Sequence, residues 1–390
     1  MKRVCIPDYE YKERIAKAAE LIRERGLDLM IVSGTESDYA NTRYFSGFWP
    51  LFERCGVAIS ASGEAALMVG PESKIFASDF SKIEKIFVLK EFRESADPAY
   101  PELIPDHFAD VFKAIGVTGK KLKIGLGSYI DCTLPIYEGL MNDYPDAEIV
   151  RCADIMVTLR KIKSINELNC IREGFRIIEL ATDEVIRKLK PGVTELQMVG
   201  VAQGVIYENG AEYEGLPMYV FSEKSTSHAI SRSSYREIKK GDIVQLNLSA
   251  KIDGYSPAIG LPVSMGKLVG EKKEIVDFCL DCHNWTEKQL KAGIEASSVA
   301  KGFYKLFEDA GKLDNFVYGP CHGTGIIEVE APWMETSSDY ILEPNMTFQI
   351  DTFVSGNGFG VRWEKGIAIT EDGCESMTDY LNKGIVEIDV

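Results

Sequence analysis

The stretch EPNMTFQIDTFVSGNGFGVRWEKGIAITEDG, residues 343–373, decides the fold class of the C-terminal half of this chain. Two apolar runs within it have strand character. Asp351 follows the run FQI, and Glu364 follows Arg362 and Trp363 in the second run. Carboxylates inside apolar strands are costly to bury unless they are paired, so both acids are candidate site residues.

Of the four histidines, His322 is the most informative. It lies in YGPCHGTGIIEVEAPW, where the flanking glycines permit close backbone approach, so we expect it to point into a crowded pocket. His107 lies in a helix-like stretch and is interpreted as structural. His283 closes Cys279-Leu-Asp-Cys282-His283, a haem-attachment pattern, but the continuous helical periodicity around it predicts a plain helix instead.

The first part of the chain alternates helical and strand patterns. Residues 9–25 have apolar positions at helical spacing, residues 27–34 read as a buried strand, and short apolar runs interleave with helix-like segments such as 106–115. This alternation is typical of an α/β domain. We place that domain at residues 1–155.

The remaining residues, 156–390, show a different pattern of expected helices and strands. Ser164 with Glu167 three positions later forms a capping box before a long amphipathic helix, and Thr194 is expected to cap a second helix. Strands are expected over 241–265, around a DGY turn, and over 316–370. Further helices are expected over 271–292 and 296–310. The pattern predicts an α+β domain.

Composition excludes several functional classes. The 390 residues include 44 basic and 60 acidic side chains, a net charge of −16, which argues against nucleic-acid or anionic-membrane partners. No apolar run is long enough to span a membrane, and the first residues lack the apolar core of a secretory signal. The nine scattered cysteines therefore read as reduced thiols. We expect a cytoplasmic protein whose partner is a small-molecule substrate.

Several segments together resemble the pita-bread family of Xaa-Pro aminopeptidases (aminopeptidase P), prolidases, methionine aminopeptidases and creatinase. They are NTRYFSGF (41–48), LRKIKSINELNCIREG (159–174), PGVTE (191–195), KKGDIVQLNLSAKIDGYSPAIG (239–260), PCHGTGI (320–326), LEPNMTFQID (342–351) and GVRWEKGIAITEDGCE (360–375). The resemblance spans essentially the whole chain. It implies a creatinase/prolidase-type N-terminal α/β domain, a pita-bread catalytic domain, and a homodimer.

The family's dinuclear metal site is degenerate in this sequence. The resemblance places the two metal-binding aspartates on Asn247 and Ala258, the histidine on His322, and the two glutamates on Asp351 and Glu364. Alanine offers no donor atom, and a neutral amide cannot neutralise a hard cation as a carboxylate does. A second histidine of the proline-specific members falls on Val329. A single Mn, Co or Zn ion at His322, Asp351 and Glu364 remains open.

Creatinase is a metal-free precedent within the family. Its catalytic histidine falls on His228, where an imidazole suits general acid–base work without a metal. Its glutamate after the GYY turn falls on Gly260, which argues against creatine as the substrate.

The sequence therefore predicts a metal-independent, creatinase-like hydrolase of a C–N bond, with no cofactor. Its substrate is expected to be small and cationic or zwitterionic. His228 and Glu364 are the predicted catalytic residues, and the predicted substrate-binding residues are His322, Asp351, Arg362 and Trp363. One alternative is a metal-dependent Xaa-Pro dipeptidase or aminopeptidase with a reduced metal site. Another is a non-catalytic binding protein with a peptidase fold that has lost its catalytic activity.

Overall fold

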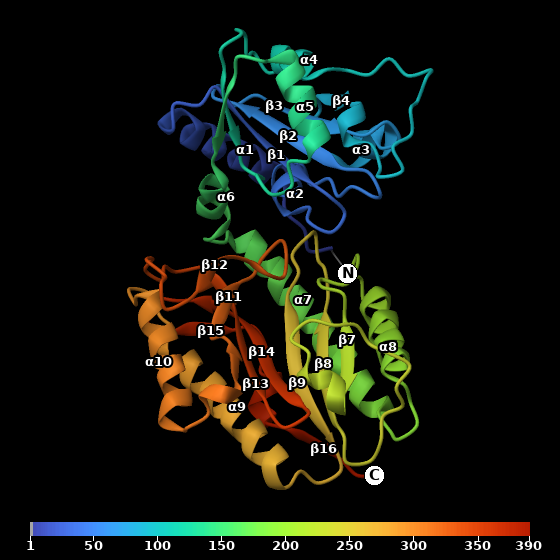
Figure 1. Cartoon of the computed structure of the whole chain (residues 1–390), viewed down its shortest axis with the longest axis vertical. Helices are drawn as coiled ribbons and strands as arrows, with labels where there is room; N and C mark the ends of the chain where they lie inside the picture. Colours follow the sequence, from blue (N-terminus) through green and yellow to red (C-terminus); the bar gives the residue numbers. More distant parts are fainter. Residues whose placement is uncertain (1–2) are drawn as a thin grey trace. The chain divides into compact units, whose positions relative to one another are not determined.

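A computed structural model describes residues 3–390 and divides the chain into two compact units. The first unit is Ile6–Arg160, and the second contains Lys161–Val390. The expected boundary after residue 155 falls within a helix, Ala153–Arg160, that belongs to the first unit. Each unit has its own sheet and helices (Figure 1).

The N-terminal unit is a six-stranded mixed sheet in the order β4-β3-β2-β1-β5-β6. Its core includes Leu29, Ile31, Phe92, Phe108 and Phe112, all buried. The strands are β1 (Leu29–Gly34), β2 (Cys55–Ser60), β3 (Ala65–Val69), β4 (Ile86–Val88), β5 (Lys123–Leu126) and β6 (Glu148–Arg151). The helices are α1 (Asp8–Glu24), α2 (Ala40–Ser46), α3 (Lys74–Phe80), α4 (Phe108–Ala114), α5 (Leu134–Asp143) and α6 (Ala153–Arg160), with a short 3₁₀ turn η1 (Lys90–Phe92). The expected α/β class is confirmed.

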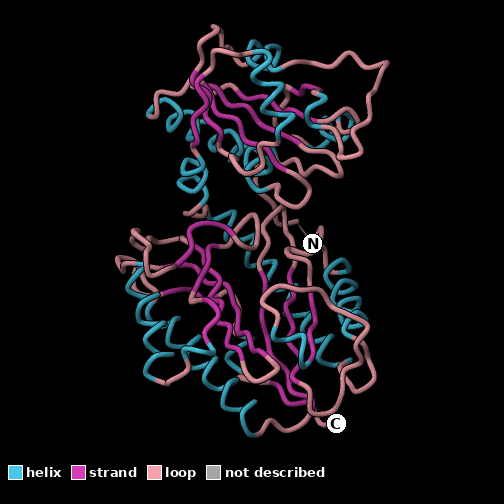
Figure 2. Tube along the Cα trace, viewed as in Figure 1, coloured by secondary structure: helices cyan, strands magenta, loops and turns pink. Residues whose placement is uncertain are grey.

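The C-terminal unit is built around a ten-stranded sheet whose main path is β12-β11-β13-β14-β9-β8-β7. Its strands are drawn in magenta in Figure 2. The strands are β7 (Tyr219–Ser222), β8 (Ile243–Ser249), β9 (Ala258–Met265), β10 (Phe316–Tyr318), β11 (Cys321–Gly323), β12 (Glu330–Met334), β13 (Thr347–Ser355), β14 (Gly360–Ile369), β15 (Cys374–Ser376) and β16 (Val386–Ile388). β10, β15 and β16 pair at the side with β13, β14 and β9.

Four long helices pack on this sheet. They are α7 (Ile165–Lys188), α8 (Glu195–Glu208), α9 (Gly270–Gln289) and α10 (Ala296–Asp309). Three short 3₁₀ turns, η2 (Glu223–Ser227), η3 (Leu313–Asn315) and η4 (Tyr380–Lys383), complete the unit. α7 packs on β8 and β9, α8 on β7, and α9 on β13 and β14. The expected α+β pita-bread class is confirmed.

Local sequence explains how two of these helices begin. The Ser164 hydroxyl accepts a hydrogen bond from the Glu167 N–H at 3.1 Å, and the Glu167 carboxylate accepts one from the Ser164 N–H at 2.6 Å. Thr194 caps α8 in the same way through the Gln197 N–H, at 3.2 Å. Each box satisfies donors that the first helical turn leaves unpaired. Both predicted caps are confirmed.

Cys279, Cys282 and His283 all lie within α9, as the periodicity predicted. The nine cysteines are free thiols. None of the helices within residues 3–390 combines the length and apolar character that a membrane crossing requires.

Candidate functional site

The candidate site lies on a row of residues that crosses four neighbouring strands of the C-terminal sheet. Asn247 on β8 pairs with Gly260 on β9, Gly260 pairs with Glu364 on β14, and Glu364 pairs with Asp351 on β13. Directly paired residues in a sheet point to the same face. The register therefore places the Asn247, Glu364 and Asp351 side chains on one face.

Gly260 has no side chain, and the space this leaves in the row lets the Asn247 and Glu364 side chains meet. A Cβ at position 260 would lie 2.7 Å from the Glu364 Cβ, so a larger residue would displace Glu364. Across this gap Asn247 Nδ2 donates a hydrogen bond to Glu364 Oε2 at 2.9 Å. The creatinase-type glutamate that falls on this position has no room here.

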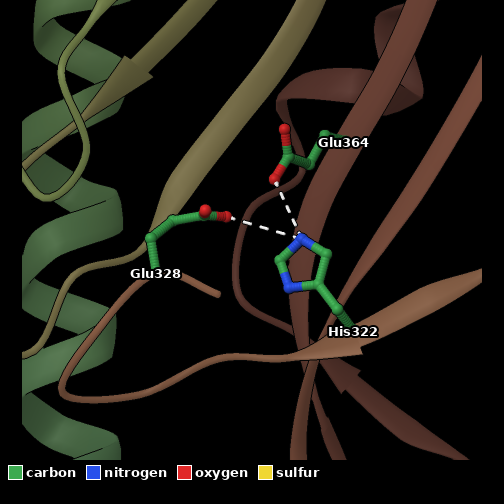
Figure 3. A group of neighbouring side chains, drawn as sticks. All are labelled: His322, Glu328 and Glu364. Atoms are coloured by element: carbon green, nitrogen blue, oxygen red, sulfur yellow. Dashed lines mark ion pairs between the residues drawn. The ribbon is translucent and has the colours of Figure 1, made fainter. Parts of the chain in front are cut away.

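His322 on β11 and Glu328 in the loop after it complete the cluster (Figure 3). The His322 Nε2 atom lies 3.6 Å from Glu328 Oε1, 3.9 Å from Glu364 Oε1 and 3.9 Å from Asp351 Oδ2. All four side chains are buried. Within residues 3–390, His322, Glu328 and Glu364 form the group whose ligand atoms lie close enough together, within 4.8 Å, to hold a metal ion.

Little positive charge compensates the three carboxylates. Burial, together with Asp351 and Glu328 nearby, holds the pKa of Glu364 well above its usual range. Burial also raises the pKa of Glu328 to about 7. A cation bound beside such a carboxyl would favour its ionised form and release its proton to solvent, because the positive charge stabilises the carboxylate.

Arg362 on β14 forms an ion pair with this cluster, and most of its guanidinium donors are used by protein groups. Its Nε atom lies 3.2 Å from Asp351 Oδ1, and its Nη2 donates to the Ala229 carbonyl at 2.9 Å. Its guanidinium also donates to the hydroxyls of Tyr219 and Tyr318. Arg362 therefore fixes the position of Asp351 and has little capacity left for a ligand.

A cavity of about 800 Å³ opens above the cluster, and its lining belongs entirely to the C-terminal unit. His322, Glu328, Asp351, Arg362 and Glu364 form its polar floor. Its walls are mostly apolar and include Leu196, Val199, Leu216, Met218, Ile230 and Trp333. The Trp333 ring centroid lies 5.4 Å from that of His322.

Two predicted site residues lie outside this cavity lining. Trp363 is fully buried on the other face of β14, where its Nε1 donates to the Val276 carbonyl of α9 at 3.4 Å. Side chains alternate along a strand, so Trp363 cannot share a face with Arg362 and Glu364. His228 is exposed at the end of η2, with its ring 6.4 Å from that of Phe221. The structure does not bring His228 to the cluster.

Sequence reasoning missed Glu328. The signal was present, because Glu328 interrupts the apolar run that follows His322, just as Asp351 and Glu364 interrupt theirs. The two degenerate positions, Asn247 and Ala258, are both buried on the strands beside Glu364.

Comparisons with known proteins identify the relatives of this chain. The model of metallopeptidase family M24 matches residues 169–371, and that of the creatinase/prolidase N-terminal domain matches residues 14–162. An uncharacterized peptidase, YqhT, of Bacillus subtilis is 26% identical over 94% of this chain and 97% of its own length. A Xaa-Pro dipeptidase of Pyrococcus furiosus is 23% identical over 94% of this chain and 98% of its own.

Solved structures agree on the fold. The X-Pro aminopeptidase from Thermotoga maritima superposes with a TM-score of 0.82 at 21% identity, covering 96% of this chain and 99% of that one. The matches confirm the resemblance, the two-domain fold and a hydrolase that acts on C–N bonds, the class of bond that peptidases cleave. Peptidases of this family typically use divalent metal ions.

Proposed function

Because the chain belongs to metallopeptidase family M24, we propose that it hydrolyses short peptides of the Xaa-Pro type with a single divalent cation. His322, Glu328 and Glu364 would hold that cation. The observation that supports this most strongly is the buried cluster of their three ligand atoms on the floor of the cavity. This proposal replaces Asp351 by Glu328 in the ligand set expected from the sequence.

The residues present do not fit a two-metal centre. Ala258 has no donor atom, and Asn247 supplies an amide oxygen where a carboxylate would be needed. They fit one cation well. The Oδ1 atom of Asn247 and the Oε1 atom of Glu328 are buried without a hydrogen-bond partner in the described chain. Unpaired buried oxygens are costly unless a ligand satisfies them, and oxygen with one imidazole suits Mn²⁺, Co²⁺ or Zn²⁺.

A bound cation would lower the pKa of a water molecule and polarise the scissile carbonyl. Asp351 is the carboxylate outside the ligand set, and we assign it the role of general base and then general acid. Its carboxylate takes the proton of the attacking water, whose oxygen bonds to the carbonyl carbon. The C–N bond then breaks, and Asp351 returns the proton to the leaving nitrogen. Arg362 positions Asp351, and Tyr219 and Tyr318 position Arg362.

The test combines metal content with hydrolysis. Protein purified without added metal is analysed for Mn, Co and Zn, before and after incubation with Mn²⁺, and assayed on a panel of Xaa-Pro dipeptides. We expect one metal per chain, activity that chelation removes, and recovery on adding metal back. Absence of stoichiometric metal, together with chelator-resistant activity, would overturn the proposal. Two metals per chain would show that Asn247 and Ala258 are not the degenerate positions.

A metal-independent, creatinase-like hydrolase remains the second candidate. The specific observation in its favour is the loss of two carboxylates, at Asn247 and Ala258, from a floor that keeps three buried acids. Such a floor favours a cationic substrate such as an amidine or guanidine. This candidate predicts hydrolysis of guanidino or amidino compounds that resists chelation.

A further inference from the structure

The turn between α8 and β7 is fixed on the face of the sheet that carries the two degenerate metal positions. The N–H groups of Gly215 and Leu216 both donate to the Ser249 hydroxyl at 3.0 Å, and that hydroxyl donates to the Leu216 carbonyl at 3.0 Å. Ser249 pairs with Ala258 across β8 and β9. It also lies two residues after Asn247 on β8, and side chains two apart on a strand share a face. The turn therefore packs beside the floor of the cavity.

This turn places a carboxylate in the cavity wall. Glu214 is half-buried and is, among the described residues, the one carboxylate of the lining besides the three of the floor. Its Oε2 atom accepts a hydrogen bond from Gln203 Nε2 at 3.3 Å and another from the Met218 N–H at 3.2 Å. Because one donor belongs to α8 and the other to the turn, the two together hold the carboxylate in a defined direction.

The carboxylate of Glu214 has no protein cation beside it. Both of its donors are neutral, and in the part of the chain that the structure describes its Oε1 atom accepts no hydrogen bond. Arg232, on the loop between β7 and β8, also lines the cavity, but it forms no ion pair with Glu214. A partly desolvated carboxylate attracts a cation more strongly than one in bulk water, because the surrounding dielectric is lower. A cationic group of a ligand would therefore be bound here.

The surroundings of Glu214 favour one kind of cation. Leu196 and Val199 of α8 line the same cavity, as do Leu216 and Met218 of the turn. A lysine or arginine side chain buries its aliphatic stem along apolar surface while its charged head reaches a polar partner. The wall offers apolar surface for such a stem and a carboxylate for its head.

We propose that Glu214 binds the cationic side chain of the substrate and makes this enzyme selective for peptides with lysine or arginine before the scissile bond. Every dipeptide carries an α-ammonium group, which the three floor carboxylates attract whatever the side chain. Glu214 lies outside that floor, so it discriminates between side chains. The inference rests on the proposed peptidase function and adds the class of side chain that the cavity prefers.

The test measures the binding of two ligands that cannot be hydrolysed. They are analogues of Lys-Pro and norleucyl-Pro in which a methylene replaces the peptide carbonyl, and they differ by the side-chain ammonium alone. Isothermal titration uses the full chain with Mn²⁺. We expect the wild type to bind the lysyl analogue about tenfold more tightly, the effect typical of a hydrogen bond between charged groups.

Glu214→Gln keeps a hydrogen-bond acceptor for Gln203 and Met218 but removes the charge, so it should bind the two analogues equally. Glu208→Gln is the matched control, an exposed acid at the end of α8 outside the cavity lining, and it should keep the preference. Equal binding by the wild type, or an unchanged preference in Glu214→Gln, would overturn the role of Glu214. An equal loss of affinity for both analogues would overturn it too, because the loss would not concern the side-chain ammonium.

Hydrolysis of Xaa-Pro dipeptides is measured separately, so the two proposals fail separately. A preference that depends on Glu214, in a protein that hydrolyses no Xaa-Pro dipeptide with any metal, would support the cation site and overturn the peptidase proposal. Metal-dependent hydrolysis by a wild type that binds the two analogues equally would do the reverse. Failure to bind either analogue would overturn this inference, and the dipeptide assay would still decide the proposed function.

Discussion

At the scale of single residues, the floor of the cavity holds more buried negative charge than its protein partners neutralise, and a bound cation would neutralise it. Glu328, Asp351 and Glu364 are buried together, and Arg362 is the one cation paired with them among the described residues. Like charges so close cannot all ionise in a low-dielectric site. This is why the pKa values of Glu328 and Glu364 are raised.

Glu328→Gln tests the residue that the family pattern does not contain. The amide keeps the shape of the side chain but removes its charge, so we expect the Mn²⁺ affinity to fall at least about tenfold, with peptidase activity falling in parallel. Metal titration followed by assay at saturating Mn²⁺ separates the two effects. Glu335→Gln, an exposed acid just beyond β12, is the control and should leave both unchanged. Unchanged affinity in Glu328→Gln would remove Glu328 from the ligand set.

His283 allows a prediction about pH. Burial lowers the pKa of His283 to about 3, while its Nδ1 atom lies 3.2 Å from the Trp363 carbonyl behind the site. The unfolded chain therefore binds this proton near pH 6.5 and the folded chain does not, so stability is complete above that pH and is lost as the pH falls toward 3. We expect about 1.4 kcal/mol of unfolding free energy to be lost through His283 between pH 7.5 and pH 5.5.

Urea unfolding of the wild type and His283→Gln at these two pH values, followed by tryptophan fluorescence, measures this contribution. The variant should show a smaller loss on acidification, whatever its absolute stability. His228→Gln serves as the control, because His228 is exposed, and it should retain the wild-type dependence. Identical losses in wild type and His283→Gln would show that His283 does not couple protonation to folding.

The sequence indicated some site residues better than others, and burial explains which. Asp351 and Glu364 stand out because a carboxylate inside an apolar strand needs a reason to be there. Glu328 obeys the same rule but follows a glycine-rich turn, where an acid is unremarkable. Arg232 and His228 lie on one exposed loop, where no periodicity shows which side chain faces the cavity.

At the scale of elements, local signals predicted the helices more fully than the sheet. The capping boxes at Ser164 and Thr194 involve residues three apart, so the sequence alone displays them. The pairing of Glu364 with Gly260 joins strands about a hundred residues apart, and no local pattern encodes it. The family resemblance supplied that order of strands, and the computed structure supplied the register.

Glu195, fully buried at the start of α8, accepts hydrogen bonds from both ends of the β7–β8 loop, and this contact between elements can be tested directly. Glu195→Ala removes an acceptor that satisfies five donors of the β7–β8 loop, so we expect a loss of about 3 kcal/mol in unfolding free energy. Amide hydrogen exchange should quicken over residues 223–233. Glu208→Ala, an exposed acid at the other end of α8, should change neither quantity. Unchanged exchange in Glu195→Ala would show that other contacts hold the loop.

At the scale of the whole molecule, the two units have separate cores. One core is centred on the N-terminal sheet, with Leu29 and Phe112 among its members, and another lies under β13 and β14, with Phe348 and Ile367. The sequence indicated both domains because helical and strand patterns alternate in the first and are grouped into longer helices and runs of strands in the second. It did not indicate that the helix Ala153–Arg160 belongs to the first unit, since a short amphipathic helix at a junction suits either side.

Every residue of the candidate metal site belongs to the C-terminal unit, and this leads to a prediction about a fragment. A chain of residues 161–390 keeps its own core, the four long helices and all proposed ligands, so we expect it to fold and to bind one Mn²⁺ with an affinity within about threefold of the full chain. Circular dichroism and metal titration measure the two quantities. The same fragment carrying Glu364→Gln should fold but lose the metal. If the fragment folds yet binds no Mn²⁺, the cluster of His322, Glu328 and Glu364 is insufficient alone, and the N-terminal unit must contribute to the site.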